Sequence, residues 1–146
     1  MKVLTWSVRA ALAAVFVGAA LSKIADPAGF AAAIRTYRLL PPWAVAGLAL
    51  WLPWLELCSG LAVFSPRHRG AAGGLLAAAC ALFLAAIAQA WVRGLDLNCG
   101  CFGGPATIRG VDYLWLFARD LALLAAAGWL CHREWRAQRS ARQDLT

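Results

Sequence analysis

Charged residues are scarce in this sequence. Asp, Glu, Lys and Arg together make up 14% of its 146 residues, whereas 62% are hydrophobic. Soluble domains carry about 25% charged residues, so this composition excludes a soluble globular domain and indicates a membrane protein. The sequence also has no phosphate-cradling glycine motif, no His-rich metal cluster, no Ser/His/Asp set and no evident repeat. Their absence argues against a nucleotide-binding enzyme, a serine hydrolase and a repeat array.

Long apolar runs are what the sequence has instead, at about residues 3–21, 43–64, 70–92 and 111–131. Each is long enough to cross a hydrocarbon core, which takes about 20 helical residues. Lipid offers the backbone no hydrogen-bond partners, and no alternating pattern of barrel strands is visible, so we expect helices. We therefore predict an all-α integral membrane protein: a four-helix bundle at residues 1–132, followed by a basic cytoplasmic tail at residues 133–146 that is either a polar helix end or a disordered segment.

The net charge of +7 arises from basic residues at the ends of the apolar runs and not on one soluble face. This placement argues against nucleic-acid binding and indicates membrane topology. With four crossings, eight basic residues share the side of the termini and five fall on the other side: Lys2, Arg9, Arg67, Arg69, Arg133, Arg136, Arg139 and Arg142 against Lys23, Arg35, Arg38, Arg93 and Arg109. The positive-inside rule then predicts cytoplasmic termini and an outward-facing loop between the third and fourth spans.

A short amphipathic helix is expected between the first and second spans. Asp26-Pro27 is a helix-start signal, with Asp as the N-cap and Pro at the first helical position. Phe30, Ile34 and Tyr37 follow at helical spacing, and a pair of prolines ends the segment. Such a helix would lie on the outer face of the membrane. Two roles fit it equally well: a docking wall or lid for the outward loop, or a simple interfacial connector.

Four charged residues are predicted to lie within the spans or at their ends: Lys23, Glu56, Arg119 and Asp120. A carboxylate in mid-membrane is costly and usually faces the bundle interior, paired with a cation. We expect Glu56 to pair with Arg119 of the fourth span, and Lys23 to extend its long side chain to the outer surface. The Glu56 pair would be either a proton or substrate relay, or a purely structural link between helices.

The most informative stretch is Cys99-Gly100-Cys101-Phe102-Gly103, where two thiols lie one residue apart. A thiolate is the nucleophile in disulfide exchange, and a second thiol nearby resolves the mixed disulfide. The glycines give the backbone freedom for a small ring and for close approach by another protein. The pattern therefore favours a redox site in an outward-facing, oxidising compartment.

Neighbouring charges and competing chemistries bear on the same thiols. Arg93 and Arg109 would favour the thiolate form, whereas Asp96 would oppose them. Paired thiolates also bind soft metals such as Cu(I), Zn or Hg, although such sites usually have more than two ligands. A soft-metal transporter, a non-catalytic scaffold for a redox partner and a loop with incidental thiols are therefore the alternatives.

The other cysteines are distant from this loop by helix position. The sequence has five cysteines, an odd number, so at least one has no partner within a monomer. Cys58, Cys80 and Cys131 lie at different depths of the spans, where a free cysteine behaves as a small hydrophobic residue. In the transporter alternative, these three would pass a metal ion inward.

These features together resemble the MauE family of DoxX-like membrane proteins and, more distantly, the four-helix redox proteins of the vitamin K epoxide reductase type. The resemblance spans about residues 15–125. Its positions are Gly18, Lys23, Asp26-Pro27, Phe30, Tyr37, Leu39-Leu40-Pro41, Leu52-Pro53, Glu56, Gly60, Gly94-Leu95-Asp96, Cys99-Gly100-Cys101-Phe102-Gly103, Arg119-Asp120, Leu121 and Leu124. The Cys-Gly-Cys-Phe-Gly string is its most specific part.

The resemblance implies a bacterial inner-membrane protein that assists the maturation of disulfide-containing proteins in the periplasm. The family's namesake serves the small subunit of methylamine dehydrogenase alongside a thioredoxin-like partner, MauD. By this resemblance Cys99 and Cys101 are the exchanging pair, and Lys23, Glu56 and Arg119 are polar positions of the bundle interior. Asp120 departs from the asparagine expected in the family. A quinone cofactor follows only by analogy with the epoxide reductase type, from whose Cys-x-x-Cys spacing this sequence departs.

Overall fold

The structure is a computed structural model that describes residues 2–95, 97–98, 107–108 and 111–143. These residues form helices and two short strands: α1 (Lys2–Ala25), α2 (Pro27–Thr36), α3 (Pro42–Ala62), α4 (Arg69–Val92), β1 (Leu97–Asn98), β2 (Thr107–Ile108) and α5 (Val111–Gln143). Four of the helices, α1, α3, α4 and α5, are long and apolar enough to cross a membrane. The predicted all-α membrane fold is thereby confirmed, including a short helix between the first two spans.

The fourth long helix continues beyond its apolar run. Of the two forms expected for the basic tail, a polar helix end or a disordered segment, the helix is the one found, because α5 extends to Gln143. The sequence has neither Pro nor Gly between Trp129 and Gln143 and is rich there in Arg, Ala and Gln, which favour helix. The basic residues from Arg133 to Arg142 therefore belong to the same helix as the span.

Helix α2 begins as the sequence predicts. The Asp26 carboxylate accepts a hydrogen bond from the backbone N–H of Gly29 at 2.8 Å, and Pro27 occupies the first helical position. Phe30 and Ala33 are buried against the rest of the protein. Helix α2 packs against α3 and β1, so it bridges the start of a membrane-spanning helix and the strand that precedes the predicted thiols.

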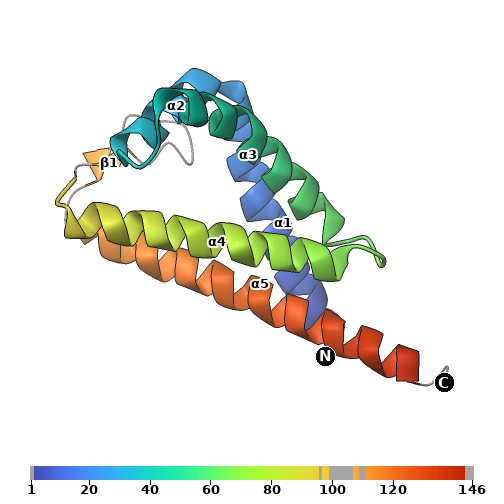
Figure 1. The fold of residues 1–146 in the computed structure, drawn as a ribbon. Coiled ribbons are helices and arrows are strands. Elements are labelled where there is room, and N and C mark those ends of the chain that lie inside the picture. Colours follow the sequence, from blue (N-terminus) through green and yellow to red (C-terminus); the bar gives the residue numbers. More distant parts are fainter. Residues whose placement is uncertain (1, 96, 99–106, 109–110, 144–146) are drawn as a thin grey trace.

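The long helices pack as two pairs, with α1 against α3 and α4 against α5. The pairs approach each other at the end where α1 begins and α5 ends, and they diverge toward α2 and β1 (Figure 1). An apolar core joins them near the closed end. It combines residues of α1, α4 and α5 with the residue that follows α3: Leu12, Ala13, Phe16, Val63, Ala72, Leu76, Cys80, Ala127 and Leu130.

Large hydrophobic side chains cover the outer surface. Trp43, Trp51, Leu82 and Val92 are 79%, 79%, 73% and 88% exposed. Soluble monomers rarely expose contiguous apolar surface on this scale, whereas lipid-facing helices do so by necessity. The exterior is therefore suited to lipid.

Close contact within the α4–α5 pair depends on Gly73. A Cβ atom at this position would lie 3.2 Å from the backbone nitrogen of Cys131 and 3.3 Å from the carbonyl oxygen of Ala127. Both neighbours are backbone atoms of α5, so neither can move aside without moving the helix. Small residues that allow backbones to approach in this way are a common means of packing membrane helices.

Replacing Gly73 with alanine is expected to lower stability, with Gly128→Ala as the matched control. At Gly128 an added Cβ has nothing within 4 Å, so that variant gains helix propensity without a clash. We expect Gly73→Ala to be less stable than Gly128→Ala by about 1–3 kcal/mol. Unfolding titrations in mixed detergent micelles measure the difference, and equal stability of the two variants would contradict this packing.

Candidate functional site

The predicted thiol pair belongs to the chain between β1 and β2. Cys99, Gly100, Cys101, Phe102, Gly103 and Arg109 lie outside the described residues. The strands on either side are described: β1 and β2 pair antiparallel, with Leu97 opposite Ile108 and Asn98 opposite Thr107. The pairing brings the two ends of segment 99–106 together at one point of the protein.

A glycine turns the chain out of α4 toward β1. Gly94 has φ of +61°, in the left-handed region that side chains disfavour. Its N–H donates to the carbonyl of Trp91 at 3.0 Å, and the N–H of Leu95 donates to the carbonyl of Ala90 at 3.0 Å. This is the hydrogen-bond pattern of a Schellman helix end. It satisfies the last carbonyls of α4 and fixes the direction in which the chain leaves the helix.

An aromatic cluster secures the base of the strand pair. The Tyr113 hydroxyl of α5 donates a hydrogen bond to the carbonyl oxygen of Leu95. The Tyr113 ring stacks on Trp91 of α4 with centroids 6.2 Å apart, and Phe117 contacts the same Trp91 at 6.1 Å. Tyr37, the residue after α2, packs on this cluster. The exit of α4, the entry of α5 and the end of α2 are therefore held together.

Of the charged residues predicted to lie near the thiols, Arg93 is the one that the structure describes. It is exposed at the C-terminal end of α4. With the Gln89 amide oxygen turned toward it, the Arg93 guanidinium donates to that oxygen. Its effect on the thiols stays a prediction, as does the role of α2 as a docking wall or lid.

A buried ion pair links α1 to α3. The Lys23 ammonium donates to both carboxylate oxygens of Glu56, at 2.8 and 2.6 Å, and each side chain is 2% exposed. The same ammonium lies 5.0 Å from the ring of Phe30 on α2 and 5.2 Å from the ring of Phe83 on α4. Lys23 therefore contacts three other helices with its charged end.

The predicted pairing of Glu56 with Arg119 is wrong, because Lys23 takes that place and is buried instead of reaching the surface. Arg119 pairs with its neighbour Asp120, at 2.9 Å. Lys23 lies beside Glu56 because the first part of α3 extends past the end of α1. Lys23 lies about 3 Å before the end of α1, whereas Glu56 lies about 21 Å along α3, so the first part of α3 extends past α1. Helix α2 covers that part of α3.

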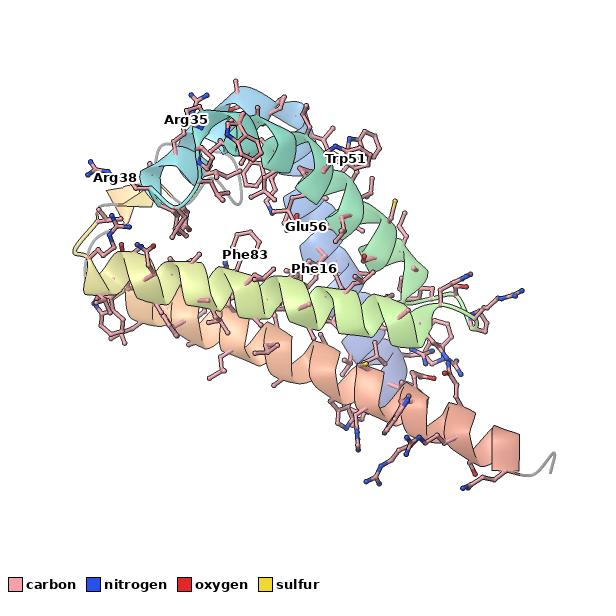
Figure 2. All side chains as sticks on the ribbon, in the orientation of Figure 1. Phe16, Arg35, Arg38, Trp51, Glu56 and Phe83 are labelled. Carbon is pink, nitrogen blue, oxygen red and sulfur yellow. The ribbon has the colours of Figure 1, made fainter. Side chains whose placement is uncertain are left out.

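The two ion pairs line one small cavity. Its volume is about 50 Å³, and its polar lining consists of Lys23, Glu56, Cys80, Arg119 and Asp120. The side chains of Glu56, Phe16 and Phe83 gather between the helices, whereas Arg35, Arg38 and Trp51 point outward (Figure 2). The formal charges of the four ionic residues sum to zero, which suits a membrane interior. The volume accommodates about one or two water molecules.

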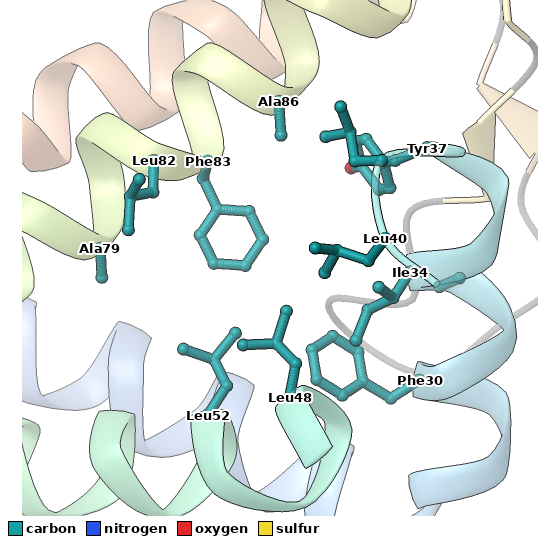
Figure 3. Close-up of a pocket in the computed structure, with 12 residues that line it drawn as sticks. Phe30, Ile34, Tyr37, Leu40, Leu48, Leu52, Ala79, Leu82, Phe83 and Ala86 are labelled. Carbon is teal, nitrogen blue, oxygen red and sulfur yellow. The ribbon is translucent and has the colours of Figure 1, made fainter. Parts of the chain in front are cut away.

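A larger, apolar cavity of about 160 Å³ adjoins this cluster between α2, α3 and α4 (Figure 3). Phe30 and Phe83 line it and also contact Lys23, so the two sites share a wall. Among its described lining residues, Tyr37 supplies the one side-chain hydroxyl. Quinone binding stays a prediction by analogy.

The remaining cysteines lie apart from one another. Cys58 is exposed, Cys80 is buried and Cys131 is intermediate, and all three are free thiols. Within residues 2–95, 97–98, 107–108 and 111–143, no three His, Cys, Asp or Glu side chains lie close enough together to hold a metal ion.

The sequence reasoning missed a second charged cluster. Glu134 of α5 accepts a hydrogen bond from Arg9 of α1 at 2.5 Å and lies 2.6 Å from Nε of Arg69 of α4. Arg9 and Arg69 were interpreted only as topology signals. Glu134 was the available signal, because it is the lone acid within the basic segment 133–142 and would need partners if it were buried.

Removing one member of the Lys23–Glu56 pair should destabilise the protein strongly. Lys23→Met and Glu56→Gln each leave the other charge of the pair buried alone, at a cost of about 3–5 kcal/mol. The double variant should recover most of that loss. Arg35→Gln, at an exposed position of α2, is the control. Unfolding in mixed micelles measures the coupling, and additive losses in the double variant would contradict it.

The chain is similar in sequence to one family of known proteins. A family model described as "Methylamine utilisation protein MauE" matches residues 1–133. The methylamine utilization protein MauE of Methylophilus methylotrophus is 35% identical over 113 residues, covering 77% of this chain and 59% of the relative. The protein of the same name from Paracoccus denitrificans is 35% identical over 123 residues, covering 84% and 65%. That from Methylorubrum extorquens is 38% identical over 101 residues, covering 68% and 54%.

The chain thus spans between 54% and 65% of the length of these relatives. No solved structure shows a significant match. The family match covers nearly all of the membrane-spanning part, and the relatives agree with it. The chain belongs to the MauE family of multi-pass membrane proteins.

Proposed function

We propose that this MauE-family protein is a membrane thiol–disulfide redox protein. In this proposal Cys99 and Cys101 exchange electrons with a periplasmic thioredoxin-like protein, comparable to MauD. The observation that carries the proposal is the pairing of Asn98 with Thr107, which joins the ends of the segment that contains both thiols. Cys99 directly follows the paired Asn98, and a single residue separates it from Cys101, so the chain itself keeps the two thiols close, which favours resolution of a mixed disulfide.

The exchange proceeds in two balanced steps. In the oxidising direction, a partner thiolate attacks one sulfur of the Cys99–Cys101 disulfide, and the other sulfur leaves as a thiolate. The second partner thiolate then attacks the mixed disulfide, so the partner is oxidised and the Cys99/Cys101 pair is reduced by two electrons. The reverse sequence reduces the partner. The relative reduction potentials of the two proteins set the direction.

The client of this chemistry is proposed to be a disulfide-containing periplasmic protein, within methylamine utilisation as the relatives are named. The proposed location is the bacterial inner membrane, with cytoplasmic termini and a periplasmic thiol loop. The beginning of α1 and the end of α5 lie at the same end of the molecule, away from β1, as this topology requires (Figure 1). The positive-inside count supports the same orientation.

Thiol trapping in intact cells tests both the topology and the exchange. A background with Cys58→Ala, Cys80→Ala and Cys131→Ala leaves only Cys99 and Cys101 to react. We expect a membrane-impermeant maleimide to label this pair only after mild reduction, because the pair is a disulfide exposed to the periplasm. Full labelling without reductant would contradict a disulfide, and labelling only after cell lysis would contradict the orientation.

A single-thiol variant tests exchange with a partner. In Cys101→Ser, a mixed disulfide formed at Cys99 has no second thiol to resolve it, and Cys99→Ser is the reciprocal variant. We expect one of the two to accumulate a covalent adduct with a thioredoxin-like protein, which reductant releases. The double variant should form none and should lose client maturation. Full client maturation in the double variant would refute catalysis and favour a scaffold.

A further inference from the structure

A polar cavity of about 260 Å³ lies between α1, α4 and α5. Its main polar lining consists of Thr5 and Arg9 of α1, Arg69 of α4, and Arg133 and Glu134 of α5. These residues belong to the beginning of α1, the beginning of α4 and the last third of α5, which meet at the end of the protein remote from β1 (Figure 1). The cavity is therefore separate from the proposed redox site.

The lining carries an excess of positive charge. One carboxylate, that of Glu134, serves two guanidiniums: it accepts from Arg9 at 2.5 Å and lies 2.6 Å from Arg69. A third guanidinium, that of Arg133, donates to the hydroxyl of Thr5. Three cations and one anion leave a net charge of about +2 in a partly enclosed space, which attracts an anion.

One hydrogen-bond donor of Arg9 has no acceptor among the described residues. Its side chain is only 8% exposed, and its Nε is buried with no hydrogen-bond partner among the described residues. A buried guanidinium donor without an acceptor is costly and uncommon. Because the cavity lined by Arg9, Arg69 and Arg133 is roomy and basic, an anion with several acceptor oxygens would find guanidinium donors there. Phosphate is such an anion, and arginine binds it with a planar fork of donors.

Aromatic side chains around the cavity place it at the level of lipid head groups. Trp6, Trp129 and Trp135 are 57%, 40% and 49% exposed. Arg133 lies over the Trp129 ring at 5.4 Å, and Arg139 lies over the Trp135 ring at 3.5 Å. Exposed tryptophans beside arginines are typical of the boundary between hydrocarbon and water. Basic pockets between membrane helices at this level bind anionic phospholipid head groups.

We propose that the cavity between Arg9, Arg69 and Arg133 binds the phosphate group of an anionic phospholipid. Arg9 and Arg133 donate to the phosphate oxygens, while Glu134 holds Arg9 and Arg69 in place. The acyl chains extend along the exposed apolar side chains of α1, such as Val3 and Leu4, which are 79% and 60% exposed. Inorganic phosphate shares this chemistry without the chains, so it is the second source to test.

The test compares two variants of the full-length protein that each remove one positive charge from α5. Arg133→Gln removes a cavity donor without touching the Glu134 ion pairs, and Arg139→Gln removes a cation outside the cavity. Binding of phosphatidylglycerol, phosphatidylcholine and inorganic phosphate is measured by native mass spectrometry and thermal shift in detergent. We expect Arg133→Gln to weaken phosphatidylglycerol binding by about tenfold or more, and Arg139→Gln to leave it near the original value.

Arg9→Lys gives an independent measure, because it retains the charge and removes the planar fork of guanidinium donors. It should also weaken phosphatidylglycerol binding while leaving the fold intact, as judged by the unfolding midpoint without lipid. Stabilisation by inorganic phosphate equal to that by phosphatidylglycerol would overturn the lipid as occupant and leave a free-phosphate site. Equal binding of phosphatidylcholine and phosphatidylglycerol, or equal losses in Arg133→Gln and Arg139→Gln, would overturn the site itself.

Discussion

The cost of a charge away from water is the constraint on which this structure depends. Lys23 and Glu56 are each 2% exposed, and the ammonium lies 2.6 Å from the carboxylate. Either charge alone would be costly within a bundle that spans lipid. The ion pair therefore fixes the position of α1 along α3. The Lys23 ammonium also contacts the rings of Phe30 on α2 and Phe83 on α4. One lysine thereby fixes the relative positions of four helices.

The thiol-bearing segment is supported differently, by aromatic packing and backbone geometry. Tyr113 reaches from α5 to the carbonyl of Leu95 and stacks on Trp91 of α4. Tyr113 is buried and Leu95 is half-buried, so the hydrogen bond between them is partly shielded from competing water. The ends of the segment are therefore fixed independently of the charged cluster in the bundle. In the proposed function, the rigid part is the base of the loop, and the chemistry belongs to the residues between the strands.

Much of the fold follows from the sequence, because apolar length and helix-start signals are local properties. The four spans and the Asp26-Pro27 start of α2 were predicted from them. The partner of Glu56 was not predicted correctly, because it depends on how far α3 extends past α1. That extension places Lys23, and not Arg119, beside Glu56. The Glu134 cluster was missed because the partners of Glu134, Arg9 and Arg69, lie far from it along the chain. The role of Cys99 and Cys101 still rests on their spacing and on the family.

The pairing of Asn98 with Thr107 has a consequence for how such proteins diversify. Because the strand pair closes the segment at its base, residues between the strands can be inserted, deleted or replaced without displacing α4 or α5. In the proposed function, the segment between the strands can then change to match a different partner surface while the membrane-spanning helices stay constant. Under the same proposal, members of the family can differ in their partner proteins by exchanging one short loop while the helices stay the same.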